Sequence, residues 1–241
     1  MPRFYCPQPL AEGATVDLPE AVAHHLYVVR QQAGDELVLF NGAGGQYLAR
    51  LVDVGKKRAS AELLAFEPVE AELPYAVTLA QALPEGSKMD WIIEKAVELG
   101  VAAVQPLAAQ RSVVRLSGER AEKRQAHWEG VVVSASEQCG RNRLARVEPL
   151  AEFGRWIGQP AAQARILLTP RATQSLAGWA RATAARDVTL LVGPEGGLTG
   201  QEEDAALAHG ALALAMGPRV LRTETAGLAA LAILAAAWDG I

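Results

Sequence analysis

The sequence predicts an α/β protein with a mostly parallel, doubly wound sheet that follows a small antiparallel β-domain. Three observations support this fold class. Beyond residue 74, short apolar runs alternate with helical stretches, as parallel strands alternate with their connecting helices. Two of these runs, 165–169 and 188–192, are bounded by turn-forming residues, as are strands buried on both faces. Before residue 67, three strand-like runs are joined by tight turns, which favours an antiparallel sheet or small barrel.

The N-terminal β-domain is expected to span residues 1–70. Its helix is predicted over 21–32, because Pro19 is tolerated near a first helical turn, where its missing N–H is not needed. The three predicted strands are 36–40, 46–54 and 59–66. The glycine-rich segment 41–45 and the segment 55–58 have the composition of the turns between them.

An acidic stretch with two prolines, 67–74, is expected to link this domain to a second one over 74–241. Apolar runs and helical periodicity define the elements of that second domain. Its strands are predicted at 75–83, 101–107, 165–169, 188–192 and 211–216. Its helices are predicted at 88–99, from a cap at Ser117 to about 138, and at 175–185, 202–209 and 224–238.

Composition and charge limit the classes of function. The 241 residues are 50% hydrophobic, which is enough to bury a core and makes disorder a poor reading. A net charge of −4 does not suggest a general polyanion binder. Residues 110–146, however, hold eight basic and four acidic side chains, so this stretch carries +4 and the rest −8. The stretch is either a solvated helix face or a local nucleic-acid contact.

Several chemistries are excluded by motifs that the sequence lacks. Cys6 and Cys139 are far apart and the four histidines are scattered, so we expect neither a disulfide framework nor a metal site. The sequence has no phosphate loop, dinucleotide fingerprint, zinc-protease motif or nucleophile elbow. We see no signal peptide, and the most apolar stretch, 226–238, is too short to cross a bilayer. We therefore expect a soluble, cytoplasmic protein with no membrane partner.

The segment 193–199 is the most informative in the chain. Three glycines follow a buried strand, and Thr199 and Glu202 have the spacing of a capping box for the next helix. Loops at the carboxyl ends of parallel strands bind ligands in open α/β sheets, and glycines let a ligand approach the backbone. The alternative is a tight strand-to-helix connection with no ligand. Glu195 in this loop disfavours a polyphosphate and suits a ligand with positive charge.

Two further strand ends show the same arrangement. Gly217 and Pro218 follow one predicted strand, and Thr169 and Pro170 follow another. Arg219 and Arg222 flank an apolar pair in the first of these loops, where surface ion pairing with Glu224 is the alternative to a functional role. Three such loops at strand ends predict one ligand site.

Together these segments resemble the ribosomal RNA small subunit methyltransferase E family, a member of the SPOUT class of methyltransferases. The matching segments are 193–197 (GPEGG), 216–226 (MGPRVLRTETA), 88–100 (KMDWIIEKAVELG), 137–143 (EQCGRNR) and, more weakly, 24–36. The resemblance covers nearly the whole chain in the family's order. Val97, Met216 and Ala145 depart from the Thr, Leu and Pro that are usual there, and Val97 removes a hydroxyl.

The resemblance implies a SPOUT-type fold with a C-terminal trefoil knot, a PUA-like N-terminal β-barrel domain and a homodimer. It implies methylation at N3 of a specific uridine in 16S ribosomal RNA, with S-adenosylmethionine (SAM) as cofactor and the RNA or the small subunit as partner. Two alternatives remain open. One is a SPOUT methyltransferase that acts on a ribose 2′-hydroxyl or on another RNA, and the other is a non-catalytic RNA-binding ribosome-assembly factor.

The resemblance also implies roles for individual residues. The cofactor is expected to contact residues of the three strand-end loops: Leu168, Thr169, Gly193, Glu195, Gly196, Gly197, Met216, Gly217, Leu221 and Thr223. Arg222 or Arg219 is expected to stabilise the uridine anion, with Glu224 as candidate base. Arginines and amides suit phosphates and base edges, and the residues expected to bind RNA are Arg30, Arg111, Arg141, Asn142 and Arg143.

Overall fold

The computed structural model describes residues 1–238 and 240, and position 241, where the predicted second domain ends, lies outside them. The chain divides into two compact units. The first unit contains Met1–Glu72 together with Ser136–Leu144, and the second contains Leu73–Ala135 and Ala145–Ile241. A cluster of buried apolar side chains lies within each unit.

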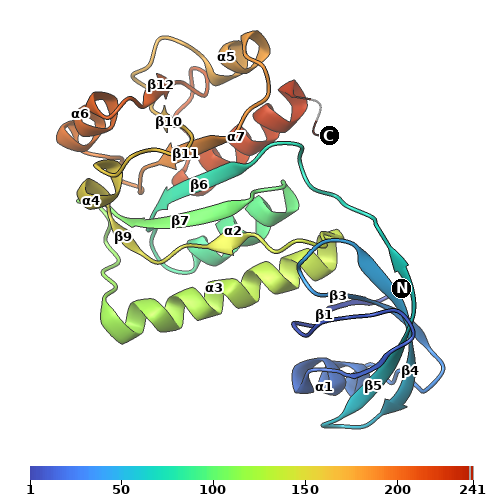
Figure 1. Cartoon of the computed structure of the whole chain (residues 1–241). Coiled ribbons are helices and arrows are strands. Elements are labelled where there is room, and N and C mark those ends of the chain that lie inside the picture. Colours follow the sequence, from blue (N-terminus) through green and yellow to red (C-terminus); the bar gives the residue numbers. More distant parts are fainter. Residues whose placement is uncertain (239, 241) are drawn as a thin grey trace. The chain divides into compact units, whose positions relative to one another are not determined.

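The first unit is built on a sheet of five strands in the described part of the chain, in the order β1-β3-β4-β5-β2 (Figure 1). Its elements are β1 (Arg3–Tyr5), β2 (Thr15–Asp17), α1 (Glu20–Val28), β3 (Glu36–Phe40), β4 (Gln46–Val54) and β5 (Ala59–Glu67). β1 is parallel to β3, and the other pairs are antiparallel. Leu26 of α1 is buried with Leu39 and Leu63 of the sheet. The predicted antiparallel β-domain is confirmed.

Helix α1 is shorter than its predicted range of 21–32. Arg30 adopts a left-handed conformation with φ of 62°, which ends the helix. The N–H of Gln31 donates to the carbonyl of Leu26, and that of Arg30 to Tyr27, the bond pattern of a Schellman cap. This cap usually uses glycine, so the helical pattern of the sequence did not show where the helix ends.

The second unit contains a parallel sheet with the order β12-β10-β11-β6-β7-β8, and β9 also pairs with β7 (Figure 1). The strands are β6 (Val77–Ala82), β7 (Ala103–Ala108), β8 (Arg146–Val147), β9 (Ala151–Glu152), β10 (Ala164–Leu168), β11 (Val188–Val192) and β12 (Leu212–Leu214). All these pairs are parallel. β11 lies between β10 and β6, and every one of its residues is buried. The predicted mostly parallel sheet is confirmed.

Helices pack on the two faces of this sheet. They are α2 (Lys88–Glu98), α3 (Gly118–Cys139), α4 (Phe153–Ile157), α5 (Leu176–Ala182), α6 (Gly200–Ala208) and α7 (Thr223–Ala237). Phe153 of α4 and Ala206 of α6 share one apolar core with Leu191 of β11. α7 packs against β6, β11, α2 and α5. The last residues of α3, from Ser136, belong to the first unit.

The short elements β1, β2, β8, β9 and α4 were absent from the sequence prediction. The four strands have two or three residues and the helix α4 has five, little more than one helical turn, so none of them shows a hydrophobic period. α4 depends on Glu152, whose side chain accepts hydrogen bonds from the N–H groups of Gly154 and Arg155. These bonds hold the pKa of Glu152 below its ordinary value. A cap of this kind is visible only once the helix is known.

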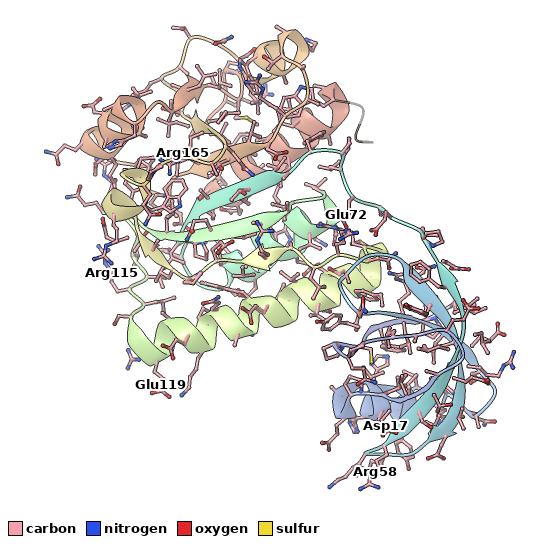
Figure 2. The ribbon with its side chains drawn as sticks, in the orientation of Figure 1. Asp17, Arg58, Glu72, Arg115, Glu119 and Arg165 are labelled. Atoms are coloured by element: carbon pink, nitrogen blue, oxygen red, sulfur yellow. The ribbon has the colours of Figure 1, made fainter. Side chains whose placement is uncertain are left out.

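Arg165 of β10 is an example of a charged residue inside this unit (Figure 2). Its guanidinium donates to the carbonyl of Ile157 at 2.7 Å and lies over the ring of Trp156, 4.5 Å from the centroid. Saturating a buried cation with carbonyl acceptors reduces its desolvation penalty.

No helix of the described residues is long and apolar enough to span a membrane. The trefoil knot stays a prediction.

Candidate functional site

A cavity of about 550 Å³ lies in the second unit, at the carboxyl ends of β10, β11 and β12. Three loops that follow these strands form its wall. The lining residues are Leu168, Thr169, Pro170, Val192, Gly193, Pro194, Glu195, Gly196, Gly197, Leu198, Glu203, Met216, Gly217, Arg219, Val220, Leu221, Arg222, Thr223 and Ala226. All ten residues expected to contact a cofactor are among them, as are Arg219 and Arg222. Glu224 is not.

The first loop, 193–199, is held in a compact shape by its own backbone. The N–H of Gly197 donates to the carbonyl of Pro194 at 2.8 Å, and Gly197 has a left-handed φ of 67°. A Cβ on Gly193 would lie 2.8 Å from the backbone nitrogen of Leu198. Thr199 and Glu202 form the predicted capping box of α6, and both of its reciprocal bonds are present. The loop therefore depends on glycine for its fold as well as for access by a ligand.

Arg111 supports this loop from outside. Its Nη1 donates to the carbonyl of Gly196 at 2.9 Å, and a Cβ on Gly196 would lie 3.3 Å from the Cβ of Arg111. Gly196 thus leaves space for the arginine side chain. Arg111, which the sequence analysis assigned to RNA, is exposed but has a structural partner in the cavity wall.

Glu195 lines the cavity, yet its charge is already paired. Its Oε1 accepts a hydrogen bond from Nζ of Lys88 at 2.7 Å and from the N–H of Glu85 at 3.0 Å. Burial by itself raises the pKa of Glu195, but these hydrogen bonds outweigh it and hold the pKa below its ordinary value. The same contact raises the pKa of Lys88. The position of Glu195 in the sequence predicts that it attracts a cationic ligand, and Lys88 weakens that attraction.

The ion pair between Glu195 and Lys88 predicts that the stability of the protein depends on pH. Glu195→Gln keeps the hydrogen-bond acceptor and removes the charge, so we expect a lower Tm than wild type at pH 7. The pKa of Glu195 is lower in the folded protein than in the unfolded chain, where it is about 4.3. The ionised carboxylate therefore stabilises the fold at pH values above the unfolded pKa, and this stabilisation is lost as the pH falls through the lower, folded pKa. The Tm difference should therefore shrink to zero between pH 5 and the folded pKa, as measured by thermal unfolding.

Glu36→Gln is the matched control for this measurement. Glu36 pairs with Arg50 at 3.3 Å, but both side chains are nearly half exposed, so a negligible effect is expected at every pH. A Tm difference for Glu195→Gln that stays constant from pH 7 to acid would contradict the role assigned to its charge.

Glu203 is a second acidic residue of the cavity, and the sequence analysis did not select it. Its Oε2 lies 3.5 Å from Nη1 of Arg171 and accepts from the hydroxyl of Thr169 at 3.5 Å. Glu203 lies outside the glycine loop, in the first turn of α6. Acidic residues are common at that position because they stabilise the N-terminus of a helix, so the sequence does not mark Glu203 as a site residue. Its place beside the loop after β10 is a tertiary feature.

Arg219 and Arg222 are the cationic residues of the wall. Both are exposed, and neither forms an ion pair or side-chain hydrogen bond with another residue in the described part of the chain. The surface pairing with Glu224 considered from the sequence is therefore absent among the described residues. Because each cavity acid has a cation beside it, these two arginines leave the cavity with a surplus of positive charge.

Glu224 is the second residue of α7 and is partly buried. Its Oε2 is shielded from solvent and has no hydrogen-bond partner among the described residues.

Thr223, the first residue of α7, is buried, and its hydroxyl donates to the carbonyl of Gly193 at 2.6 Å. Thr223 therefore joins two loops of the cavity and does not offer a free donor to a ligand.

The remaining residues assigned to RNA lie in the first unit. Arg30 is exposed at the left-handed end of α1, next to the exposed side chains of Tyr27, Val28 and Val29. Arg143 is half exposed and lies 3.4 Å from Glu70. These positions suit contact with a partner.

Arg141 and Asn142 are instead buried and occupied within the first unit. Arg141 is bonded to Glu72 through Nε at 2.9 Å and Nη2 at 2.5 Å, and Figure 2 labels Glu72. Asn142 donates to the carbonyl of Val69 at 2.6 Å and accepts from Nη2 of Arg3 at 2.7 Å. This geometry favours a structural role over the RNA contact expected for these two residues, because little of either side chain reaches solvent.

We expect Arg141→Ala to destabilise the protein by about 2 kcal/mol, less than the ~3–5 kcal/mol for a fully buried pair because Glu72 is partly exposed. Urea unfolding of the full chain measures this change. Arg143→Ala is the matched control, with at most ~1 kcal/mol lost since its pair is exposed. RNA titrations separate the roles further. The salt slope should fall for Arg143→Ala and not for Arg141→Ala, and the reverse result would restore Arg141 as a phosphate contact.

The cavity favours an organic ligand over a metal ion. Among the residues that the structure describes, no group of three or more His, Cys, Asp or Glu could hold a metal. A cavity of about 550 Å³ that is lined by a glycine-rich loop and by aliphatic side chains such as Leu168 and Leu221 fits a nucleoside-sized molecule. The unpaired arginines at the same cavity suit an anionic or polarisable second reactant.

Comparison with known families gives two matches. A model described as an RNA methyltransferase domain matches residues 71–235. A model described as an RNA methyltransferase PUA domain matches residues 18–64, which confirms the PUA-like character predicted for the N-terminal domain.

The chain is also similar to individual proteins over nearly its whole length. A ribosomal RNA small subunit methyltransferase E from Bacillus subtilis is 31% identical over 94% of this chain and 92% of its own. The crystal structure of such a protein from Neisseria gonorrhoeae, bound to S-adenosyl methionine, has a TM-score of 0.88 at 38% identity and covers 99% and 98% of the two chains. A methyltransferase structure from Legionella pneumophila with bound SAM has a TM-score of 0.92 at 33% identity, covering 98% and 97%.

Proposed function

Since the chain belongs to the ribosomal RNA small subunit methyltransferase E family, we propose that it transfers the methyl group of SAM to N3 of a specific uridine in 16S ribosomal RNA. The observation that carries this proposal is the single cavity wall that combines the glycine loop 193–197 with two unpaired arginines. One part of the wall suits a cofactor, and the other suits a nucleobase that becomes negatively charged.

The cavity fits SAM in size and chemistry. Its volume of about 550 Å³ lies within the range of small-molecule sites. Gly193, Gly196, Gly197 and Gly217 place backbone without side chains at the wall, and Leu168, Met216 and Leu221 provide apolar contact. These residues are proposed to hold the cofactor. When bound, SAM supplies a methyl group that is already activated by the adjacent sulfonium.

The protein's task is then to orient the uridine and to manage its charge. Uridine N3 carries a proton and becomes a nucleophile as that proton leaves, while negative charge spreads onto the two carbonyl oxygens of the base. A guanidinium stays protonated in proteins, so Arg222 and Arg219 act by electrostatic stabilisation and do not accept the proton. Their lack of partners among the described residues leaves them free to bind the base.

We propose Glu224 as the acceptor of the N3 proton. Its Oε2 is shielded from solvent and has no hydrogen-bond partner in the described part of the chain, which leaves an acceptor available. Because Glu224 does not line the cavity and its Oε2 is shielded from solvent, transfer to it requires the side chain to move toward the cavity. Glu195 and Glu203 are weaker candidates, since each already forms an ion pair, with Lys88 and with Arg171 respectively.

RNA is proposed to contact both units. In the first unit the exposed end of α1 offers Tyr27 for stacking and Arg30 for phosphate, a combination common in RNA-binding surfaces. Arg143 adds a second cation. In the second unit the exposed Arg111 stands beside the loop 193–197. We also propose that the protein is cytoplasmic and forms a homodimer. Size-exclusion chromatography with light scattering tests the dimer.

The function is tested with purified protein, labelled SAM and either isolated 16S RNA or assembled small subunits. Nucleoside mass spectrometry of the product should show 3-methyluridine. A 2′-O-methylated nucleoside would support the alternative acceptor, and SAM-independent RNA binding with no methylation would support an assembly factor. The Gly193→Ala variant, expected to bind no cofactor, serves as the negative control.

A further inference from the structure

Gln81 is a buried polar residue that no sequence motif included. It lies on β6 and is 0% exposed. In the parallel pairing of β6 with β11 it is opposite Val192, the residue that precedes the loop 193–199. Gln81 does not line the cavity, but its hydrogen-bond partner Thr223 and its strand neighbour Val192 do.

The hydrogen bonds of Gln81 have a defined direction. Its Nε2 donates to the carbonyl of Ala82 at 2.9 Å and to Oγ1 of Thr223 at 2.9 Å. A backbone carbonyl only accepts, so the contact with Ala82 settles which end of the amide carries the protons. Oγ1 of Thr223 accepts from Gln81, and its single proton is therefore donated to the carbonyl of Gly193 at 2.6 Å.

This chain of bonds joins three segments that are far apart in the sequence. Gln81 belongs to the central strand β6, and Gly193 begins the glycine loop after β11. Thr223 begins α7, directly after the loop that holds Arg219 and Arg222. Both Gly193 and Thr223 line the cavity. The bond between Gln81 and Thr223 is buried and the bond between Thr223 and Gly193 is partly buried, so competition from water is weakest at the Gln81 end.

The other end of the amide supports a functional reason for glutamine at this position. Oε1 of Gln81 is buried and has no hydrogen-bond partner among the described residues. An unpaired buried acceptor destabilises a fold, whereas an apolar side chain of similar size would avoid that penalty. The unpaired Oε1 of Gln81 is unfavourable, so the reason for glutamine at this position has to be the two hydrogen bonds that its Nε2 donates.

We propose that Gln81 is a positioning residue that preorganises the SAM site by holding the hydroxyl of Thr223 against the carbonyl of Gly193. The inference rests on the proposed function only in taking SAM as the ligand of the cavity. It requires no assumption about which atom of the RNA is methylated. A preformed site spends less binding energy on ordering its loops, so loss of the bridge should appear first in cofactor affinity.

The test compares Gln81→Met with Gln105→Met. Gln105 is a matched control on the adjacent strand β7, since it is also buried and its Nε2 donates to the carbonyls of Pro106 and Pro149, away from the cavity. Titration calorimetry with SAM should show an affinity about tenfold weaker for Gln81→Met and unchanged for Gln105→Met. Thermal unfolding should show similar small changes for both variants. Unchanged SAM affinity in a folded Gln81→Met protein would overturn the proposal.

A second pair of variants tests the same bridge from its other end. Thr223→Val removes the hydroxyl, whereas Thr223→Ser retains it, so only the first should weaken SAM binding. In the double variant with Gln81→Met, the loss should be no larger than for Thr223→Val alone, because both changes break one bridge. Fully additive losses would overturn the proposal. If Gln81→Met fails to fold, unchanged SAM affinity in Thr223→Val would overturn it instead.

The outcome is separable from that of the proposed function. A wild-type protein that binds SAM but leaves 16S RNA unmethylated would refute the proposed reaction and leave the bridge testable by calorimetry. A wild-type protein that methylates the RNA, with a Gln81→Met variant of full SAM affinity, would refute the bridge alone.

Discussion

Replacing Gly193 with alanine is expected to abolish SAM binding, with an affinity reduced by at least about 100-fold. The added Cβ would lie 2.8 Å from the nitrogen of Leu198 and 3.2 Å from the carbonyl carbon of Gly197. Both are backbone atoms, so no side-chain rotation relieves the clash and the loop itself has to open. Opening it also breaks the contact between the carbonyl of Gly193 and Thr223, which joins the two loops of the cavity.

Gly200→Ala is the matched control for this variant. Gly200 is the first residue of α6, and nothing lies within 4 Å of a Cβ placed there. SAM affinity measured by calorimetry should be that of wild type, and Tm should be equal or slightly higher because alanine is the better helix former. If Gly193→Ala bound SAM as well as Gly200→Ala, the loop 193–197 would not be the cofactor site.

Replacing Arg222 with alanine is expected to lower kcat by about 100- to 1,000-fold, the usual effect of removing one group that stabilises charge in a transition state. Arg222 is the N-cap residue of α7, lines the cavity and has no side-chain partner among the described residues. Its removal should leave SAM affinity nearly unchanged, because its proposed role is toward the uridine. Single-turnover methylation and SAM calorimetry on the same preparation measure the two effects.

The pH profile distinguishes a charge-stabilising role from simple loss of RNA binding. Without Arg222 the uridine anion is less stable, so the rate of the variant should rise more steeply with pH than that of wild type. Arg181→Ala, an exposed arginine on α5 outside the cavity, should behave as wild type. A parallel pH profile for Arg222→Ala, with a raised KM for RNA and an unchanged kcat, would contradict the catalytic assignment.

The fold could be predicted wherever local chemistry determines an element. β3, β4 and β11 have the predicted bounds, because turn residues flank each run and the runs are long enough to show their hydrophobic pattern. The capping box at Thr199 places the start of α6. Prediction failed for the end of α1, which depends on a non-glycine residue in the left-handed region, and for the short elements β1, β2, β8, β9 and α4.

The candidate site was predictable in its residues but not in its interactions. Glycine and proline after apolar runs mark the ends of β10, β11 and β12, and parallel pairing brings those ends to one edge of the sheet. The contribution of Glu203 was missed because its sequence position is ordinary for a first helical turn. Gln81 was missed because a single amide within a strand carries no signal of its partners.

The sequence by itself determined which loops surround the cavity, since glycine and proline after apolar runs mark the strand ends and a parallel sheet brings such ends to one edge. Only the tertiary structure decided the state of each charge and each polar group. Glu195 meets Lys88, Glu203 meets Arg171 and Arg141 meets Glu72, whereas Arg219 and Arg222 meet no partner among the described residues. The physical reason is distance. Hydrogen bonds and short-range ion pairs act over a few ångströms, and the packing of the chain determines which distant residues come that close.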